Sequence, residues 1–163
     1  MNFACTYPEL LSKLIVADIS PRYYTPHHQD VIAGLQSIGL DTLTSREEAD
    51  RLLAAHLPEV GVRQFLLKNL YRNDQGKFAW RMNFDTIVEQ IENIGEETKG
   101  PPFSKPTLFL KGERSRYITE KDEALITQLF PESKTETIAD AGHWLQAEQP
   151  IAFVTAVINF LNS

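Results

Sequence analysis

A short apolar run near the start of the chain constrains its fold more than any other feature. Residues 14–19 read Leu-Ile-Val-Ala-Asp-Ile, include β-branched side chains and are followed by Pro21. A strand that is apolar on both sides has to be covered on both faces, as in a parallel sheet flanked by helices. The sequence therefore predicts a buried parallel strand and an α/β fold.

The last third of the chain repeats this rhythm of strand and helix. Residues 106–112 and 134–139 are predicted as strands, and residues 120–130 and 150–161 as helices. Proline at position 150 suits the first turn of the closing helix. Strands that alternate with helices predict further parallel strands in the same sheet.

The intervening residues 22–102 have a different pattern, in which amphipathic helices dominate. Such an insertion after the carboxyl end of a strand lies where doubly wound sheets form their ligand crevices. We therefore expect residues 1–21 and 103–163 to form an α/β core and residues 22–102 a helical insertion. Within the insertion, helices are predicted over 30–38, after an N-cap at 44–45, over 60–70 and over 85–94, and a hairpin arm over 76–82.

Composition narrows the functional classes. The 163 residues are 42% hydrophobic and 23% charged, without a secretion signal or an apolar run near the roughly 18 residues of a membrane span. We therefore expect a soluble, cytoplasmic protein. The net charge of -6, without a basic cluster, argues against nucleic acid or membrane partners. The single cysteine, Cys5, excludes an internal disulfide and is interpreted as a packed hydrophobe.

His143 is the strongest candidate for chemistry. It follows Gly142 and precedes Trp144, in the loop that leaves the last predicted strand. Its ring would therefore lie at the carboxyl edge of the sheet, where a catalytic base is expected. The alternative is a loop histidine with no particular role.

Several segments, in order along nearly the whole chain, resemble one known family. The Gly-His-Trp turn, followed by a glutamate, a proline and an amphipathic helix, resembles the catalytic-histidine turn of the α/β-hydrolase fold. Together these segments resemble the C-terminal portion of YbfF-like bacterial esterases, which implies that residues 22–102 form a helical cap. The other matching segments are LIVADISP (14–21), PHH (26–28), FLLKNL (65–70), FAWRMN (78–83) and LFLKG (108–112).

The resemblance also bears on the acid that would orient His143. The usual aspartate position, after the penultimate strand, is occupied by Ser115, and a hydroxyl cannot stabilise an imidazolium as a carboxylate does. In YbfF-like enzymes the acid follows the earlier strand, and Asp18 matches that position. A charge within an apolar strand is costly to bury unless it is paired. Glu113 and Asp140 remain the alternative acids.

The nucleophile of the family has no counterpart in the sequence. No serine has the flanking glycines of the G-x-S-x-G elbow, and the first ten residues resemble the helix that follows it. We therefore expect the elbow and the oxyanion loop to be missing and the chain to be inactive alone. The strand at 14–19 would lack a neighbour, which predicts self-association or a companion N-terminal segment.

The resemblance implies hydrolysis of a small acyl ester or thioester by a serine, His143 and Asp18, without a metal or an organic cofactor. Trp144 is the expected pocket residue beside the histidine, and Tyr24 and Phe65 are candidates in the cap, as substrate contacts or cap core. A zinc site at His27 and His28 is disfavoured because no carboxylate lies at ligand spacing. Alternatives are dehalogenase, epoxide hydrolase or C–C hydrolase chemistry on the same fold, or a non-catalytic interaction fragment.

Overall fold

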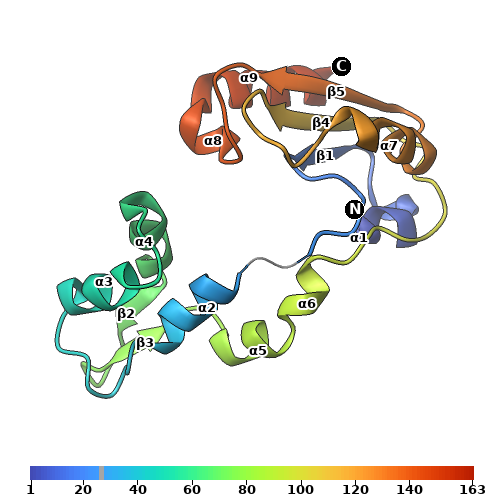
Figure 1. Ribbon diagram of the computed structural model, residues 1–163. Coiled ribbons are helices and arrows are strands. Elements are labelled where there is room, and N and C mark those ends of the chain that lie inside the picture. Colours follow the sequence, from blue (N-terminus) through green and yellow to red (C-terminus); the bar gives the residue numbers. More distant parts are fainter. Residues whose placement is uncertain (26–27) are drawn as a thin grey trace. The chain divides into compact units, whose positions relative to one another are not determined.

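The computed structural model describes residues 1–25 and 28–163 (Figure 1). The chain divides into two compact units. Unit 1 comprises Met1–Tyr23 and Glu96–Ser163, and unit 2 comprises Tyr24–Gly95. Pro26 and His27, which belong to one of the matching segments, lie outside the described residues.

Unit 1 contains a three-stranded parallel sheet in the order β1-β4-β5 (Figure 1). The strands are β1 (Leu14–Ala17), β4 (Thr107–Gly112) and β5 (Ser133–Ile138). Val16 pairs with Phe109, which in turn pairs with Thr135. The predicted parallel sheet of an α/β fold is thus confirmed.

Helices cover both faces of this sheet. Neighbouring residues of a strand point to opposite faces, so a single strand contributes side chains to both clusters. Val16 and Phe109 face a cluster that includes α1 (Asn2–Thr6) and α7 (Glu123–Leu129). Leu108 and Leu110 face a second cluster with α8 (Leu145–Glu148) and α9 (Pro150–Asn162). Burial on both faces therefore explains the continuous apolarity of β4, whereas β5 is largely polar.

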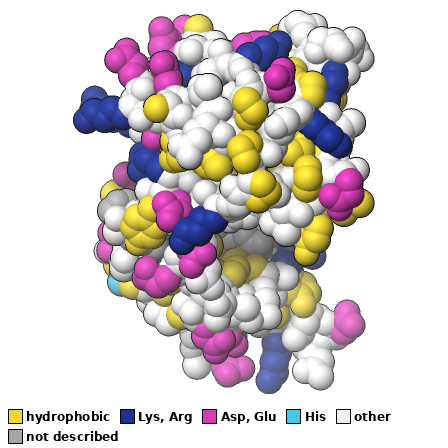
Figure 2. Space-filling view, turned by 90° about the vertical axis from the view of Figure 1, so that its right-hand side faces the viewer, with side chains coloured by type: hydrophobic (Ala, Val, Ile, Leu, Met, Phe, Trp, Pro, Cys, Tyr) yellow, Lys and Arg dark blue, Asp and Glu magenta, His cyan; other side chains and the backbone are white. Residues whose placement is uncertain are grey.

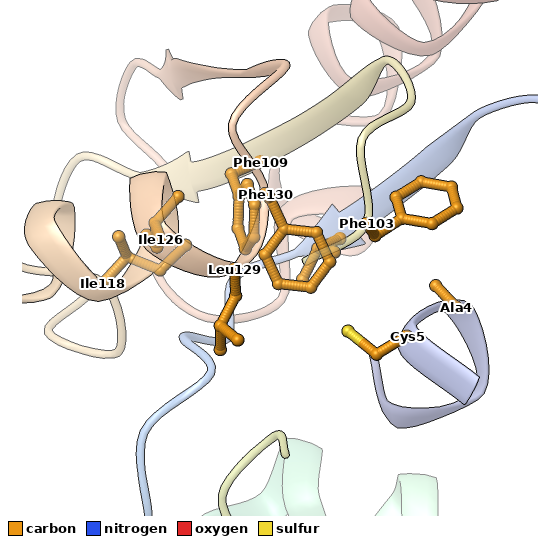
Figure 3. Packing of buried hydrophobic residues seen from close by; sticks show 9 residues of the cluster. Ala4, Cys5, Phe103, Phe109, Ile118, Ile126, Leu129 and Phe130 are labelled. Atoms are coloured by element: carbon orange, nitrogen blue, oxygen red, sulfur yellow. The ribbon is translucent and has the colours of Figure 1, made fainter. Parts of the chain in front are cut away.

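The core of the first cluster is aromatic (Figure 3). The ring of Phe130 packs edge-on against those of Phe103 and Phe109, with centroid separations of 6.4 and 5.4 Å. Cys5 points from α1 toward this cluster, and burial raises the pKa of its thiol. Cys5 is thus the packed hydrophobe that the sequence predicts.

The end of α9 is fastened to the segment that precedes β1. Lys13 Nζ donates hydrogen bonds to the carbonyl oxygens of Phe160 and Leu161, at 2.8 and 3.0 Å. A lysine at a helix C-terminus satisfies carbonyl groups that have no partner within the helix and opposes the negative end of the helix dipole. Within the described part of the chain, no helix is both long and apolar enough to cross a membrane.

Unit 2 combines helices with a small hairpin. The helices are α2 (Gln29–Gln36), α3 (Arg46–Ala54), α4 (Val60–Leu67), α5 (Phe84–Glu89) and α6 (Ile91–Ile94). The predicted hairpin arm is β3 (Phe78–Trp80), which pairs antiparallel with β2 (Leu70–Arg72). Ser45 caps α3 as predicted, since its Oγ accepts the backbone N–H of Glu48 at 3.1 Å.

Several predicted boundaries are wrong in unit 2. The helix predicted over 60–70 ends at Leu67, because Leu70 is fully buried as the first residue of β2. The helix predicted over 85–94 is divided at Gln90, whose φ of -110° and ψ of 13° end α5.

Boundaries in unit 1 differ as well. The strand predicted over 14–19 ends at Ala17, because Asp18 adopts a positive φ of 48°. The helix predicted over 120–130 begins with a 3₁₀ turn, Glu120–Asp122, which Thr119 and Asp122 close as a capping box. The short helix α8 was not predicted, and another 3₁₀ turn, Pro8–Leu10, precedes β1.

Candidate active site

Three loops of unit 1 carry the predicted base, the predicted acid and the serine that occupies the usual aspartate position. Asp18 directly follows β1, Ser115 lies in the loop after β4, and His143 lies in the loop after β5. The carboxyl ends of parallel strands meet at one edge of the sheet, so these loops are neighbours. The structure brings all three side chains together.

The carboxylate of Asp18 is the centre of this group. Its side chain is fully buried, and its Oδ1 accepts the backbone N–H of Gly112 at 3.0 Å. Its Oδ2 accepts the hydroxyl of Ser115 at 2.5 Å and lies 2.8 Å from His143 Nδ1. Because a carboxylate only accepts, the proton of this last bond is on Nδ1, which leaves Nε2 as the basic nitrogen of a neutral ring.

The left-handed backbone of Asp18 helps to place this carboxylate. The N–H of Asp18 still donates to Leu110 O at 2.7 Å, so the residue remains attached to the sheet while the chain turns. Positive φ is uncommon outside glycine, but aspartate tolerates it better than most residues. The left-handed turn thus ends β1 at Ala17 and takes the Asp18 side chain out of the alternating arrangement of side chains along the strand.

The imidazole of His143 binds a buried acid and is itself partly exposed to solvent. Its side chain is 44% exposed, although its acid partner is not exposed at all. The ring of Tyr117 stacks on it, with centroids 3.9 Å apart and ring planes 18° from parallel. Tyr117 was not identified from the sequence; the one signal was an aromatic residue two positions after Ser115.

The loop that carries His143 is fixed by close contacts to the end of β4. A Cβ at position 112 would collide with the carbonyl oxygens of Ala141 and Gly142, so only glycine allows this approach. The carboxylate of Glu148 accepts the backbone N–H groups of Gly142 and Trp144, at 2.9 and 3.2 Å. The bond from Gly142 is the main cause that lowers the pKa of Glu148.

The two alternative acids have other partners. Glu113 Oε2 accepts the backbone N–H of Asp140 at 2.9 Å, and the carbonyl of Asp140 accepts a hydrogen bond from Arg114. Among the described contacts, Asp18 is the carboxylate that binds the ring. Ser115, in the usual aspartate position, donates to Asp18 instead of replacing it.

A second buried carboxylate, Asp122, lies elsewhere in unit 1. Its side chain forms an ion pair with Arg22 Nε at 3.0 Å and accepts the hydroxyl of Ser20 at 2.9 Å. Thr119 donates to it from its backbone N–H at 2.7 Å and from its hydroxyl at 2.8 Å. Burial acts to raise the pKa of Asp122, but these hydrogen bonds and the Arg22 charge outweigh it, so the pKa lies below its ordinary value.

The predicted substrate residues are distributed over both units. Trp144 follows His143 in unit 1 and is 36% exposed. Tyr24 and Phe65 belong to unit 2, where Phe65 is 52% exposed. The contact of these three residues with substrate stays a prediction. Of the predicted His27–His28 pair, only His28 lies within the described residues.

The arrangement has the elements of a general base. A buried carboxylate holds one nitrogen of an imidazole, and the other nitrogen is on a half-exposed ring that can take up a proton. In the triad mechanism an aspartate fixes the tautomer and orientation of a histidine in this way.

Known proteins that resemble this chain include esterases and a lipase. An sn-1-specific diacylglycerol lipase, ABHD11, from Mus musculus is 36% identical over 99% of this chain and 54% of its own length. Esterase YbfF from Escherichia coli is 32% identical over 93% of this chain and 58% of its own length. No family model matches the sequence.

A solved structure agrees closely with the fold. A structure described as a marine microorganism esterase is 42% identical, has a TM-score of 0.91, and is matched over 97% of this chain and 64% of its own. The chain thus spans between about half and two thirds of the length of these relatives. The chain is similar to these esterases over nearly its whole length, and its parallel sheet with flanking helices is that of the α/β-hydrolase fold.

Proposed function

We propose that this chain contributes the base and the acid of a serine hydrolase that cleaves carboxylic esters or thioesters. The observation that carries the proposal is the 2.8 Å contact between His143 Nδ1 and the fully buried Asp18 carboxylate. The named activities of the homologues, esterase and lipase, support ester substrates.

In this reaction a serine hydroxyl attacks the carbonyl carbon of the substrate, and Nε2 of His143 accepts the serine proton. The carbon–oxygen or carbon–sulfur bond then breaks, and His143 returns the proton to the leaving alcohol or thiol. Water repeats the sequence on the acyl-serine and releases the acid. The Asp18 carboxylate orients the ring and stabilises its transient positive charge.

The serine has to come from polypeptide outside these 163 residues, because the sequence contains no G-x-S-x-G elbow. Exposed apolar surface on unit 1 supports such a companion. Figure 2 displays one face of the molecule, on which hydrophobic side chains lie exposed among charged ones. On α9, exposed apolar residues recur at helical spacing: Ile151, Val154, Ile158 and Leu161.

This helix stripe is of the kind that packs against another element. β1 is the edge of its sheet, and its last residue, Ala17, is exposed. An unpaired strand edge and an uncovered apolar stripe each favour association with further chain. We therefore propose that a companion segment of the same fold, or in its absence a second copy, covers these surfaces.

The substrate is proposed by its chemical class alone. We propose an acyl group as the part of the substrate that the site binds, with Trp144 beside His143 and with Tyr24 and Phe65 from the insertion as further apolar contacts. Residues 22–102 would then act as the lid of the acyl site. Aromatic side chains of this kind suit apolar ligands.

A chimera tests the proposed activity. The part of the marine microorganism esterase that this chain does not match is joined ahead of Met1, and hydrolysis of p-nitrophenyl butyrate is measured. We expect turnover, labelling by a fluorophosphonate, and loss of turnover in H143A. The control is D140N, which changes a neighbouring carboxylate that does not bind the ring. A folded, labelled chimera that is equally active with H143A would refute the proposal.

Light scattering after size-exclusion chromatography tests the companion. We expect the 163 residues alone to associate or to bind an apolar dye, and the chimera to do neither. The double variant I151S/I158S should reduce the association of the isolated chain. A monodisperse, cooperatively melting monomer that binds no dye would overturn this part of the proposal.

A further inference from the structure

Four residues at the carboxyl ends of the strands are linked in a closed ring of contacts. Asp18 binds His143, and His143 stacks on Tyr117. The backbone N–H of Tyr117 donates to Ser115 Oγ at 3.2 Å, and that hydroxyl donates to Asp18. The stack between Tyr117 and His143 is the only member of this ring that is not a hydrogen bond.

The hydrogen bond to Asp18 does not by itself fix the orientation of the imidazole. One bond through Nδ1 does not fix both side-chain torsions of His143, χ1 and χ2, and 44% of the side chain is exposed to solvent. In the part of the chain that the structure describes, no hydrogen bond reaches Nε2. A flat surface against one face of the ring removes the remaining rotation.

Tyr117 provides such a surface. Its ring is nearly parallel to the imidazole and close enough for direct contact. We propose that Tyr117 is a positioning residue that holds the plane of the His143 ring. Stacked aromatic pairs contribute beyond the area they bury, and an aromatic face also attracts the positive charge that forms when the imidazole takes up a proton.

The position of Tyr117 is itself secured by the acid. Its backbone is tied to Ser115, whose hydroxyl is held by Asp18 at 2.5 Å. The same carboxylate thus holds one edge of the imidazole directly and one face of it through Ser115 and Tyr117. Charged groups near the loop include Asp18 after β1, Glu113 and Arg114 after β4, Asp140 after β5 and Glu148 from α8. Arg114 pairs with Glu148 at 3.3 Å, and Glu113 accepts the backbone N–H of Asp140 at 2.9 Å.

The test measures the ring and not the turnover, so it can fail independently of the proposed function on which the role of His143 rests. In the 163-residue chain, NMR follows the ¹³C relaxation of the His143 Cε1–H group and the exchange of the Nδ1–H proton with water. We expect Y117F to match the parent, because it keeps the aromatic ring. Y117L should give a more mobile imidazole and exchange that is faster by roughly twofold to tenfold.

Matched controls separate positioning from folding. Y7L removes a tyrosine of unit 1 that is 48% exposed, against 37% for Tyr117, and should leave both signals of His143 unchanged. Backbone amide shifts report whether each variant is folded; should Y117L not fold, Y117Q replaces it. Combining Y117L with S115A should change exchange by less than the product of the single effects, because both break one ring of contacts.

An imidazole that stays as rigid in Y117L as in the parent would overturn this inference and leave the esterase proposal intact. Conversely, a chimera without turnover but with the expected Y117L effect would retain the positioning role and remove the proposed function. Equal loss of rigidity in Y117F and Y117L would also overturn it, because the effect would then depend on the hydroxyl and not on the stacked ring.

Discussion

Unit 1 buries two carboxylates, and their partners differ. Asp18 and Asp122 are 0% and 3% exposed. Asp122 faces the permanent charge of Arg22, together with hydroxyl and backbone donors from Ser20 and Thr119. Asp18 faces backbone and hydroxyl donors and one titratable ring, His143.

The difference teaches that burial alone does not identify a catalytic carboxylate. A guanidinium keeps its charge at all relevant pH values, so the Asp122 pair is closed to proton transfer and serves the fold. An imidazole can accept a proton on one nitrogen while the other donates a hydrogen bond, so the Asp18 pair can support acid–base chemistry.

The largest effect is expected for D18N in the chimera. An asparagine amide presents a donor as well as an acceptor and favours the wrong tautomer of His143, so kcat should fall by roughly 10³- to 10⁴-fold. D122N should retain most of the parent activity, since Asp122 does not contact the ring. Comparable losses of kcat in both folded variants would remove the distinction between the two carboxylates.

For the free energy of unfolding we expect the reverse order, with the larger loss in D122N. D122N leaves Arg22 without its ion pair and weakens the capping box with Thr119, so we expect the free energy of unfolding to fall by about 2–3 kcal/mol. This figure is at the lower end for a buried pair because the Arg22 side chain is 41% exposed. Urea denaturation measures it, with D140N as the control. A change as small as that of D140N would mean that the ion pair contributes little.

The pH dependence of that loss follows from the direction of the pKa shift. Because the pKa of Asp122 is lower in the folded than in the unfolded chain, the ionised carboxyl stabilises the fold above its unfolded pKa of about 3.9. This contribution is lost as the pH falls through the folded pKa. The difference in unfolding free energy between the parent and D122N should therefore be constant above about pH 5 and shrink below pH 4. A difference that grows on acidification would have the wrong sign.

The two carboxylates also differ in how far the sequence predicts them. Asp18 could be identified because it interrupts an apolar strand and matches the acid position of a family that the chain resembles. Asp122 stands in a polar stretch at the start of a helix, and its partner Ser20 is 102 positions away in the chain. A local sequence pattern does not indicate a contact over this distance, so the burial of Asp122 is seen only in the folded structure.

The same limit applies to the rest of the site and the fold. Continuous apolarity predicts β1 and β4, because burial on both faces leaves a direct trace in composition. Tyr117 left no such trace, since stacking on His143 depends on how two loops meet. In unit 2, Leu70 continued a helical pattern, but its burial in the β2–β3 hairpin decided its conformation.

Removal of the Ser115 hydroxyl should have an intermediate effect. S115A deletes one of three donors to the Asp18 carboxylate, and this is a hydrogen bond to a charged group. It also deletes the acceptor of the Tyr117 N–H. We expect kcat/KM of the chimera to fall by roughly fivefold to tenfold, well short of D18N. S115T, which keeps a hydroxyl, is the control and should recover part of the loss. A loss as large as that of D18N would make the serine an equal part of the acid.

The smallest effect is expected at Glu148, a third carboxylate that is 36% exposed and holds the backbone of the His143 loop. Water can replace a partner at such a site, so E148Q should lower kcat/KM by only roughly twofold while hydrogen exchange at the Gly142 amide becomes faster. Because the pKa of Glu148 is lowered, the parent should keep this amide protected below the ordinary glutamate value, whereas E148Q should show no protection that depends on this ionisation. A loss of activity near that of D18N would mean that the loop, and not the buried acid, limits the placement of His143. Burial would then not separate a carboxylate that acts on the ring from one that holds the backbone around it.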